Sequence, residues 1–139
     1  MVVGRSAPEE IAQLLDHDRQ ARRFSSHHGG LGPVADGRLL FSTGSKSLKA
    51  RNLSRNANCV VCTEHANEAV IVEGVAEIAE VAARRKFLAQ YHPKYNFDMS
   101  SMKDDILAMK EPVFAVRPQV VFGLWEKHFQ SKSTRWQFK

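Results

Sequence analysis

Cysteine is scarce in this sequence, with two among 139 residues. Cys59 and Cys62 form a Cys-x-x-Cys pair, but a structural zinc site needs four ligands and no second cysteine pair completes it. The run from Cys59 to Thr63 also has the composition of a strand, in which residues three apart face opposite sides. We therefore expect two small core side chains, and no metal or redox site.

Long apolar runs are also lacking. No window approaches the run of about 18 apolar residues that a membrane-spanning helix needs. The start, Met1 to Arg5, contains no apolar segment typical of a secretory signal. We predict no membrane association and a cytoplasmic location.

Charge of one sign is not concentrated in a long run. Twenty Lys and Arg residues against 15 Asp and Glu give a net charge of +5, but the basic residues are dispersed among the acidic ones. The sequence also lacks the aromatic residues interleaved with basic ones that are typical of RNA-binding modules. We do not expect nucleic acid as a partner. A few cations at a phosphate site, in the segment 46–55, account equally well for the positive excess.

The sequence does contain enough apolar residues for one core. Hydrophobic residues make up 43% of the chain, whose length suits a single domain over residues 1–139. Apolar periodicity and turn residues predict strands at 38–43, 58–64, 69–79 (bent at Gly74), 113–117, 120–126 and 134–138. They predict helices at 7–22, from the turn at Gly44 to about residue 55, at 81–91 ending before Pro93, and at 102–109. Because strands dominate and their connections are short, the expected class is a mainly antiparallel β-barrel with flanking helices.

The segment from Arg23 to Asp36 is the least regular part of the chain. Three glycines and a proline predict a loop, and no apolar alternation predicts a strand before Val34. The pair His27-His28 has no acidic or thiol neighbour at ligand spacing, so we expect exposed loop residues and no metal site. Asp36-Gly37 is a tight-turn signal that leads into the strand at 38–43.

The stretch from Phe41 to Asn52 begins as a strand, turns at Gly44 and continues as a basic helix. Ser45 or Ser47 can cap this helix, whose first N–H groups have no partner within the helix. These donors suit a phosphate together with the hydroxyls and cations of Ser42, Ser45, Ser47, Lys46, Lys49 and Arg51. A solvated basic helix after a turn is the alternative, and the stretch alone does not decide between them.

Four features recur in a recognisable order: Asp36 to Gly44, Lys49 to Leu53, Val72 to Ala76, and the closing Phe122-Gly123 with 134–138. Their order and spacing resemble the pyridoxamine 5′-phosphate oxidase-like family over about residues 36 to 138. The resemblance implies an antiparallel split β-barrel that binds FMN or a deazaflavin. It also implies a homodimer with two cofactor sites at the subunit interface.

The resemblance further implies a set of cofactor-binding residues. Phe41 and Ser42 match a strand end beside the cofactor, and Ser47 and Lys49 match positions that contact its phosphate. Arg51 is a plausible second cation.

Near the C-terminus, Trp125 and Arg135 match a tryptophan and an arginine that related oxidases place around the isoalloxazine ring and its substrate. A core or interface position for Trp125 and a surface ion pair for Arg135 remain open alternatives.

The activity that the resemblance implies is hydride transfer between FMN, or the deazaflavin coenzyme F-420, and a small organic substrate. The cofactor supplies this chemistry, so no catalytic acid or base is expected in the protein. The alternative is a non-catalytic cofactor-binding or dimeric scaffold protein of the same fold. Residues 22–37 favour this alternative, because they are atypical where the family has a regular strand pair.

Overall fold

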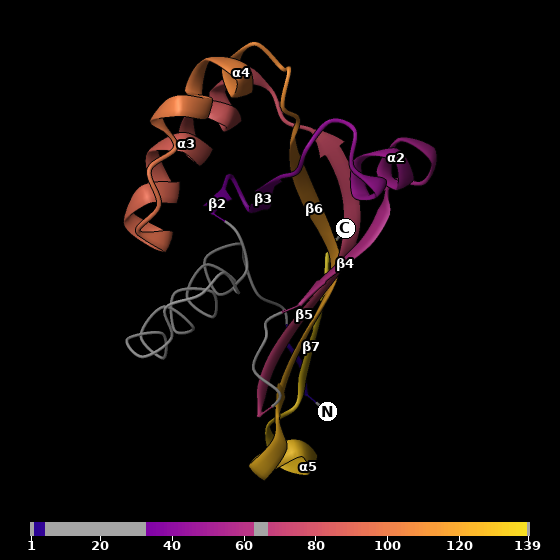
Figure 1. Ribbon diagram of the computed structural model, residues 1–139. Coiled ribbons are helices and arrows are strands. Elements are labelled where there is room, and N and C mark those ends of the chain that lie inside the picture. The colour runs from indigo at the N-terminus through magenta and orange to yellow at the C-terminus, as the bar shows by residue number, and fades with distance from the viewer. Residues whose placement is uncertain (1, 5–32, 63–66, 139) are drawn as a thin grey trace. The chain divides into compact units, whose positions relative to one another are not determined.

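The computed structural model describes residues 2–4, 33–62 and 67–138 (Figure 1). The expected helix at 7–22, most of the expected loop and the pair His27-His28 lie outside the described residues. The described chain divides into two compact units. The first unit contains residues 2–4, 60–62, 67–73 and 118–138, and the second contains 33–59 and 74–117. The expectation of one domain over residues 1–139 stays a prediction.

The second unit is built on a hairpin. Strand β2 (Val34–Ala35) pairs antiparallel with β3 (Arg38–Ser42) through a turn in which Asp36 and Gly37 have φ angles of 53° and 70°. Two positive φ angles in succession suit Asp-Gly, so the predicted turn is confirmed. Strand β3 then pairs antiparallel with the start of β6 (Val113–Trp125), in a register that places Ser42 opposite Val113.

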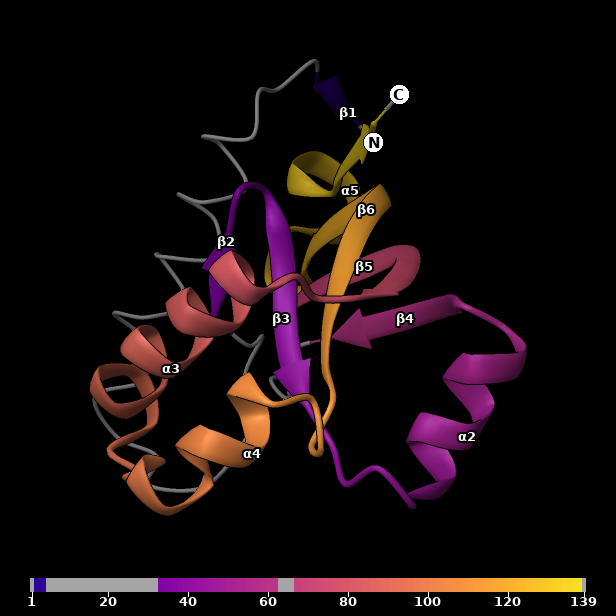
Figure 2. The ribbon, with the colours of Figure 1, turned by 90° about the horizontal axis from the view of Figure 1, so that it is seen from above.

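Helices lie on both sides of β3 in this unit (Figure 2). On one side are α3 (Val81–Tyr95), the short 3-10 helix η2 (Ser100–Met102) and α4 (Lys103–Leu107), and on the other is α2 (Leu48–Arg55). The core between the strands and α3 and α4 consists of buried apolar side chains, with Phe87, Ile106 and Val113 fully buried. Arg84 of α3 is also only 6% exposed, and its Nε and Nη1 have no hydrogen-bond partner among the described residues.

The first unit contains both terminal segments of the described chain. Strand β1 (Val2–Gly4) pairs parallel with β7 (Thr134–Gln137), and β7 pairs antiparallel with the last part of β6. The link from β6 to β7 contains the 3-10 helix η3 (Glu126–His128) and α5 (Phe129–Lys132). Trp136 is buried and stands opposite the fully buried Val121.

Strand β6 is continuous, so the prediction of two strands separated at Pro118 is wrong. Pro118 falls between the residues that pair with β3 (113–116) and those that pair with β7 (120–123). Its missing N–H therefore removes no hydrogen bond from either of these two ladders. A proline is therefore compatible with an unbroken strand at the point where that strand changes from one neighbouring strand to another.

Strand β5 (Glu68–Ile78) pairs with β6 and passes very close to it at Gly74. A Cβ at Gly74 would lie 2.4 Å from the carbonyl oxygen of Arg117 on β6. The predicted long strand is confirmed, and Gly74 serves there to let two backbones approach.

Helix α3 extends beyond its predicted end. The sequence predicts that it stops before Pro93, whereas the helix continues to Tyr95. Asn96 then adopts a left-handed conformation with φ 51°, and its N–H donates to the carbonyl of His92 at 2.8 Å. Because Pro93 lies in the final turn, it removes a single hydrogen bond near the end of the helix, and Asn96 closes that end.

Strand β4 (Asn58–Cys62) pairs with β5 and alternates between exposed and half-buried positions. Cys59 is half-buried and Cys62 is exposed, so the expectation of two core cysteines is wrong for Cys62. The expected alternation of faces is present, but no described element covers the outer face, where Val60 is 63% exposed. Burial raises the pKa of the Cys59 thiol above its ordinary value.

Candidate functional site

The turn between β3 and α2 is held by the hydroxyl of Ser47. Ser47 has extended backbone angles at the N-cap of α2, and its Oγ accepts a hydrogen bond from the N–H of Ala50 at 3.1 Å. The same Oγ lies 3.0 Å from Oγ1 of Thr43, and the N–H of Ser47 donates to the carbonyl of Gly44 at 2.9 Å. Of the two predicted caps, the structure selects Ser47. These bonds fix the start of a basic helix next to the end of β3.

Lys49 lies over the ring of Phe41. Its Nζ is 5.7 Å from the ring centroid, and the half-buried Phe41 ring stacks on Phe114 at a centroid distance of 5.4 Å. This cation–π contact places the ammonium beside the end of β3. Lys49, Lys46 and Arg51 are all exposed, and none of them forms an ion pair with another described residue.

Glu111 is a residue of this site that sequence reasoning missed. Its Oε2 accepts a hydrogen bond from the N–H of Ser45 at 3.2 Å, so a carboxylate already uses one of the exposed backbone donors of the turn. Beside it, the hydroxyl of Ser42 donates to the carbonyl of Pro112 at 3.1 Å. The register between β3 and β6 brings residues 111 and 112 to this turn, and a motif search along the chain does not reveal that register.

Trp125 and Arg135 belong to the first unit, whereas Phe41, Ser42, Ser47, Lys49 and Arg51 belong to the second. Trp125 is half-buried at the end of β6. Arg135 donates from Nη1 to Oε1 of Gln137 at 3.1 Å, and its guanidinium lies 5.9 Å from the centroid of the Phe122 ring. Among the described residues it forms no ion pair. The structure therefore brings five of the seven predicted residues into one unit, and all seven assignments to a cofactor stay predictions.

Two further observations concern the described part of the chain. No three His, Cys, Asp or Glu side chains among these residues come together in a way that could hold a metal ion. No helix within the same residues is long and apolar enough to cross a membrane.

The sequence matches no protein-family model and no curated protein, but solved structures do resemble it. A pyridoxamine 5′-phosphate oxidase-related, FMN binding protein from Nostoc punctiforme is 13% identical with a TM-score of 0.56, covering 95% of this chain and 90% of that chain. A heme binding protein from Mycobacterium smegmatis is 18% identical with a TM-score of 0.53, covering 78% of this chain. The match spans 45% of that protein's length. At these identities the likeness concerns the fold, and it confirms the predicted class. The chain has a mainly antiparallel split-barrel fold with flanking helices, the fold that it shares with the pyridoxamine 5′-phosphate oxidase-related protein from Nostoc punctiforme.

Proposed function

We propose that the turn between β3 and α2 binds the phosphate end of a flavin-type cofactor, with FMN as the first candidate. The observation that supports this most directly is the group of exposed cations at a capped helix start, where Lys49 is positioned by Phe41. Phosphate binds well where cations and hydroxyl or amide donors converge. The FMN binding protein from Nostoc punctiforme, which has the same fold, supports the choice of cofactor.

The residues present fit a phosphate group. The Oγ of Ser47 can accept from both Thr43 and Ala50, which leaves its own proton available to a phosphate oxygen. The ammonium of Lys49 and the guanidinium of Arg51 supply charge-assisted donors. Among the described residues, the atom nearest to a Cβ added at Gly44 would be Oε2 of Glu111 at 3.9 Å, so there is space beside this glycine.

We further propose an oxidoreductase that forms a homodimer and acts on a small organic substrate. A bound flavin would supply the hydride chemistry, and the protein would supply position and electrostatics. In this proposal Ser47, Lys49 and Arg51 hold the phosphate, and Phe41 and Ser42 form the adjoining strand end. Trp125 and Arg135 are assigned to the ring and the substrate. The deazaflavin coenzyme F-420 is the second candidate cofactor, since additional cations such as Lys46 and Arg55 would suit its acidic tail.

Titration of FMN into the protein, followed by quenching of flavin fluorescence, tests the phosphate site. We expect Lys49→Ala to weaken binding by about one to two decades in Kd, because it removes a charge-assisted hydrogen bond of about 1.5–3 kcal/mol. Glu111→Gln should tighten binding, because it removes a negative charge from the turn. Lys132→Ala, at an exposed position on α5, is the control for a general loss of positive charge.

An FMN dissociation constant unchanged by both Lys49→Ala and Glu111→Gln would place the phosphate elsewhere. A parallel titration with the deazaflavin coenzyme decides between the two cofactors, and saturable binding of neither would overturn the proposal. Sedimentation with and without cofactor tests the homodimer.

A non-catalytic cofactor-binding protein is the second candidate. The Mycobacterium smegmatis structure is that of a heme binding protein, so the fold is not restricted to flavins. Stopped-flow reduction of the reconstituted protein separates the two candidates. A bound flavin that neither accepts electrons from a nicotinamide donor nor passes them to an acceptor would favour the non-catalytic one.

A further inference from the structure

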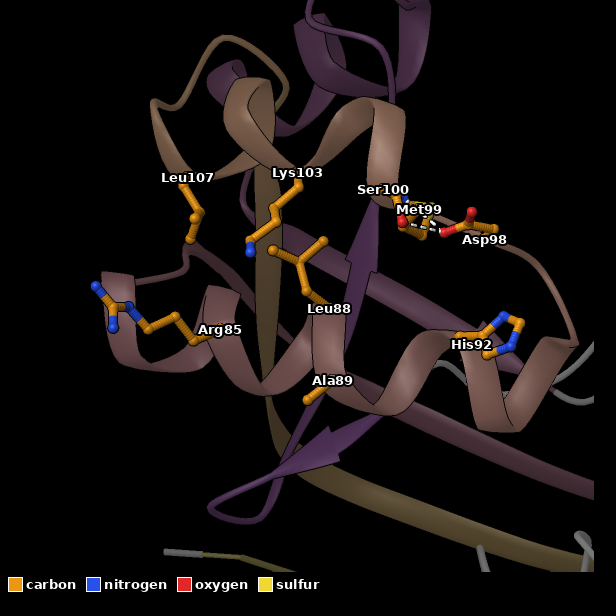
Figure 3. A pocket seen from close by; sticks show the side chains of 9 residues that line it. All are labelled: Arg85, Leu88, Ala89, His92, Asp98, Met99, Ser100, Lys103 and Leu107. Carbon is orange, nitrogen blue, oxygen red and sulfur yellow. Dashed lines mark hydrogen bonds between the residues drawn. The ribbon is translucent and has the colours of Figure 1, made fainter.

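A cavity of about 680 Å³ lies in the second unit between α3 and the segment formed by η2 and α4 (Figure 3). This volume falls within the range of about 300–1,000 Å³ that is typical of small-molecule sites. Leu88 of α3, Leu107 of α4 and the buried Met99 contribute apolar surface to its walls. In Figure 3, the side chains of Leu88 and Leu107 extend toward each other across the space between the helices.

Two basic side chains border this apolar surface. Arg85 comes from α3 and Lys103 from α4, and Figure 3 shows both at the end of the cavity that also contains Leu107. Both are exposed, and neither forms an ion pair with any residue that the structure describes. The cations therefore remain available to an anion.

Among the described residues that line the cavity, Asp98 is the one with a carboxylate, and this carboxylate already accepts hydrogen bonds. The N–H of Ser100 donates to Oδ1 of Asp98 at 2.9 Å, and the hydroxyl of Ser100 donates to the same oxygen. These bonds, assisted by the nearby His92, lower the pKa of Asp98. Asp98 and His92 lie at the opposite end of the cavity from Arg85 (Figure 3), so Asp98 does not neutralise that cationic end.

We propose that this cavity binds an amphipathic organic acid, a free small molecule with an anionic oxygen head and an apolar body. The head contacts Arg85 and Lys103, and the body covers Leu88 and Leu107. A neutral hydrocarbon would leave the two cations unpaired, and a small inorganic anion would leave the apolar walls in water. The site shares no residue with the proposed cofactor site, so the two proposals stand independently.

Isothermal titration calorimetry with decanoate, kept below its aggregation concentration, tests the proposal. We expect saturable binding of one decanoate per chain. Decanol, which lacks the charge, and acetate, which lacks the body, should each bind at least tenfold more weakly. The double variant Arg85→Gln/Lys103→Gln should lose about tenfold or more in affinity for decanoate.

Control variants separate the site from general effects. Ala89→Phe fills the cavity from an exposed position on α3 and should weaken decanoate binding without unfolding the protein, which circular dichroism checks. Lys132→Gln and Lys49→Ala should leave the decanoate affinity unchanged. The proposal is overturned if decanoate shows no saturable binding, if decanol binds as tightly as decanoate, or if the double variant binds within twofold of the parent.

Discussion

Substitution of Gly74 by alanine is the sharpest test of the packing between β5 and β6. The added Cβ would lie 2.4 Å from the carbonyl oxygen of Arg117 and 3.0 Å from Cγ1 of Val116. Because non-bonded heavy atoms are most favourable at about 3.5 Å, the two strands would have to separate by about 1 Å. The oxygen belongs to the backbone of β6, which is paired with β3 next to this point and cannot rotate away as a side chain can.

The magnitude follows from two opposing terms. Overpacking of a close contact costs about 1–3 kcal/mol and sometimes more, and a clash with backbone belongs at the upper end of that range. Replacement of glycine by alanine also lowers the conformational entropy of the unfolded chain, which raises the free energy of unfolding by about 0.4–1 kcal/mol. We therefore expect Gly74→Ala to lower the free energy of unfolding by about 2 kcal/mol or more, which corresponds to a fall of about 1 M in the urea midpoint.

The measurement is urea unfolding followed by circular dichroism and tryptophan fluorescence, with the same substitution at two other glycines as matched controls. At Gly123 the nearest atoms to an added Cβ belong to the ring of Trp136, at 3.1 and 3.2 Å, so a smaller loss is expected. At Gly44 the nearest atom lies at 3.9 Å, so Gly44→Ala should be neutral or stabilising. A loss below about 1 kcal/mol for Gly74→Ala, or a larger loss at Gly123, would contradict the described approach of β5 to β6.

Two further predictions concern buried polar groups. Arg84→Met keeps a long apolar stem and removes a buried guanidinium, two of whose nitrogens have no hydrogen-bond partner among the described residues. The free energy of unfolding measured in urea should therefore rise by about 1–3 kcal/mol, and a loss of stability would show that an anion neutralises Arg84. At pH 8 an aromatic disulfide reagent should modify the exposed Cys62 faster than the half-buried Cys59. The two rates can be measured separately in the variants Cys59→Ser and Cys62→Ser. Equal rates would contradict the burial of Cys59. Because the folded pKa of Cys59 is raised, its thiol contributes stability below its ordinary pKa of 9.0, and that contribution is lost as the pH rises through the folded pKa.

Local chemistry made several elements predictable from the sequence. Asp36-Gly37 adopts the two positive φ angles that its composition favours, and Ser47 caps the helix that follows Gly44. In these cases a few neighbouring residues determine the conformation. The resemblance across segments 36 to 138 likewise predicted the fold class that the solved structures confirm.

Features that depend on distant residues were not predictable in this way. From the sequence alone Pro118 predicts a break in the strand, because the change of pairing partner along β6, from β3 to β7, is not visible there. Glu111 accepts a hydrogen bond from Ser45 only because the register of β6 brings it to that turn. Cys62 is exposed because no described element covers the outer face of β4, and the apolar composition of the strand does not reveal this. The cavity between α3 and α4 arises from the packing of two helices whose separate sequences identify no ligand.

Because side chains alternate between exposed and half-buried positions along β4, the exposed Cys62 is a suitable attachment site for a spin label. A nitroxide attached to Cys62 would project from a regular strand, where its attachment point has a defined backbone. With Cys59 replaced by serine, each copy of the chain would carry a single label. Pulsed electron paramagnetic resonance between such labels would then measure how two copies are spaced in the proposed homodimer, without any alteration of the turn at Gly44 or of the cavity beside α3.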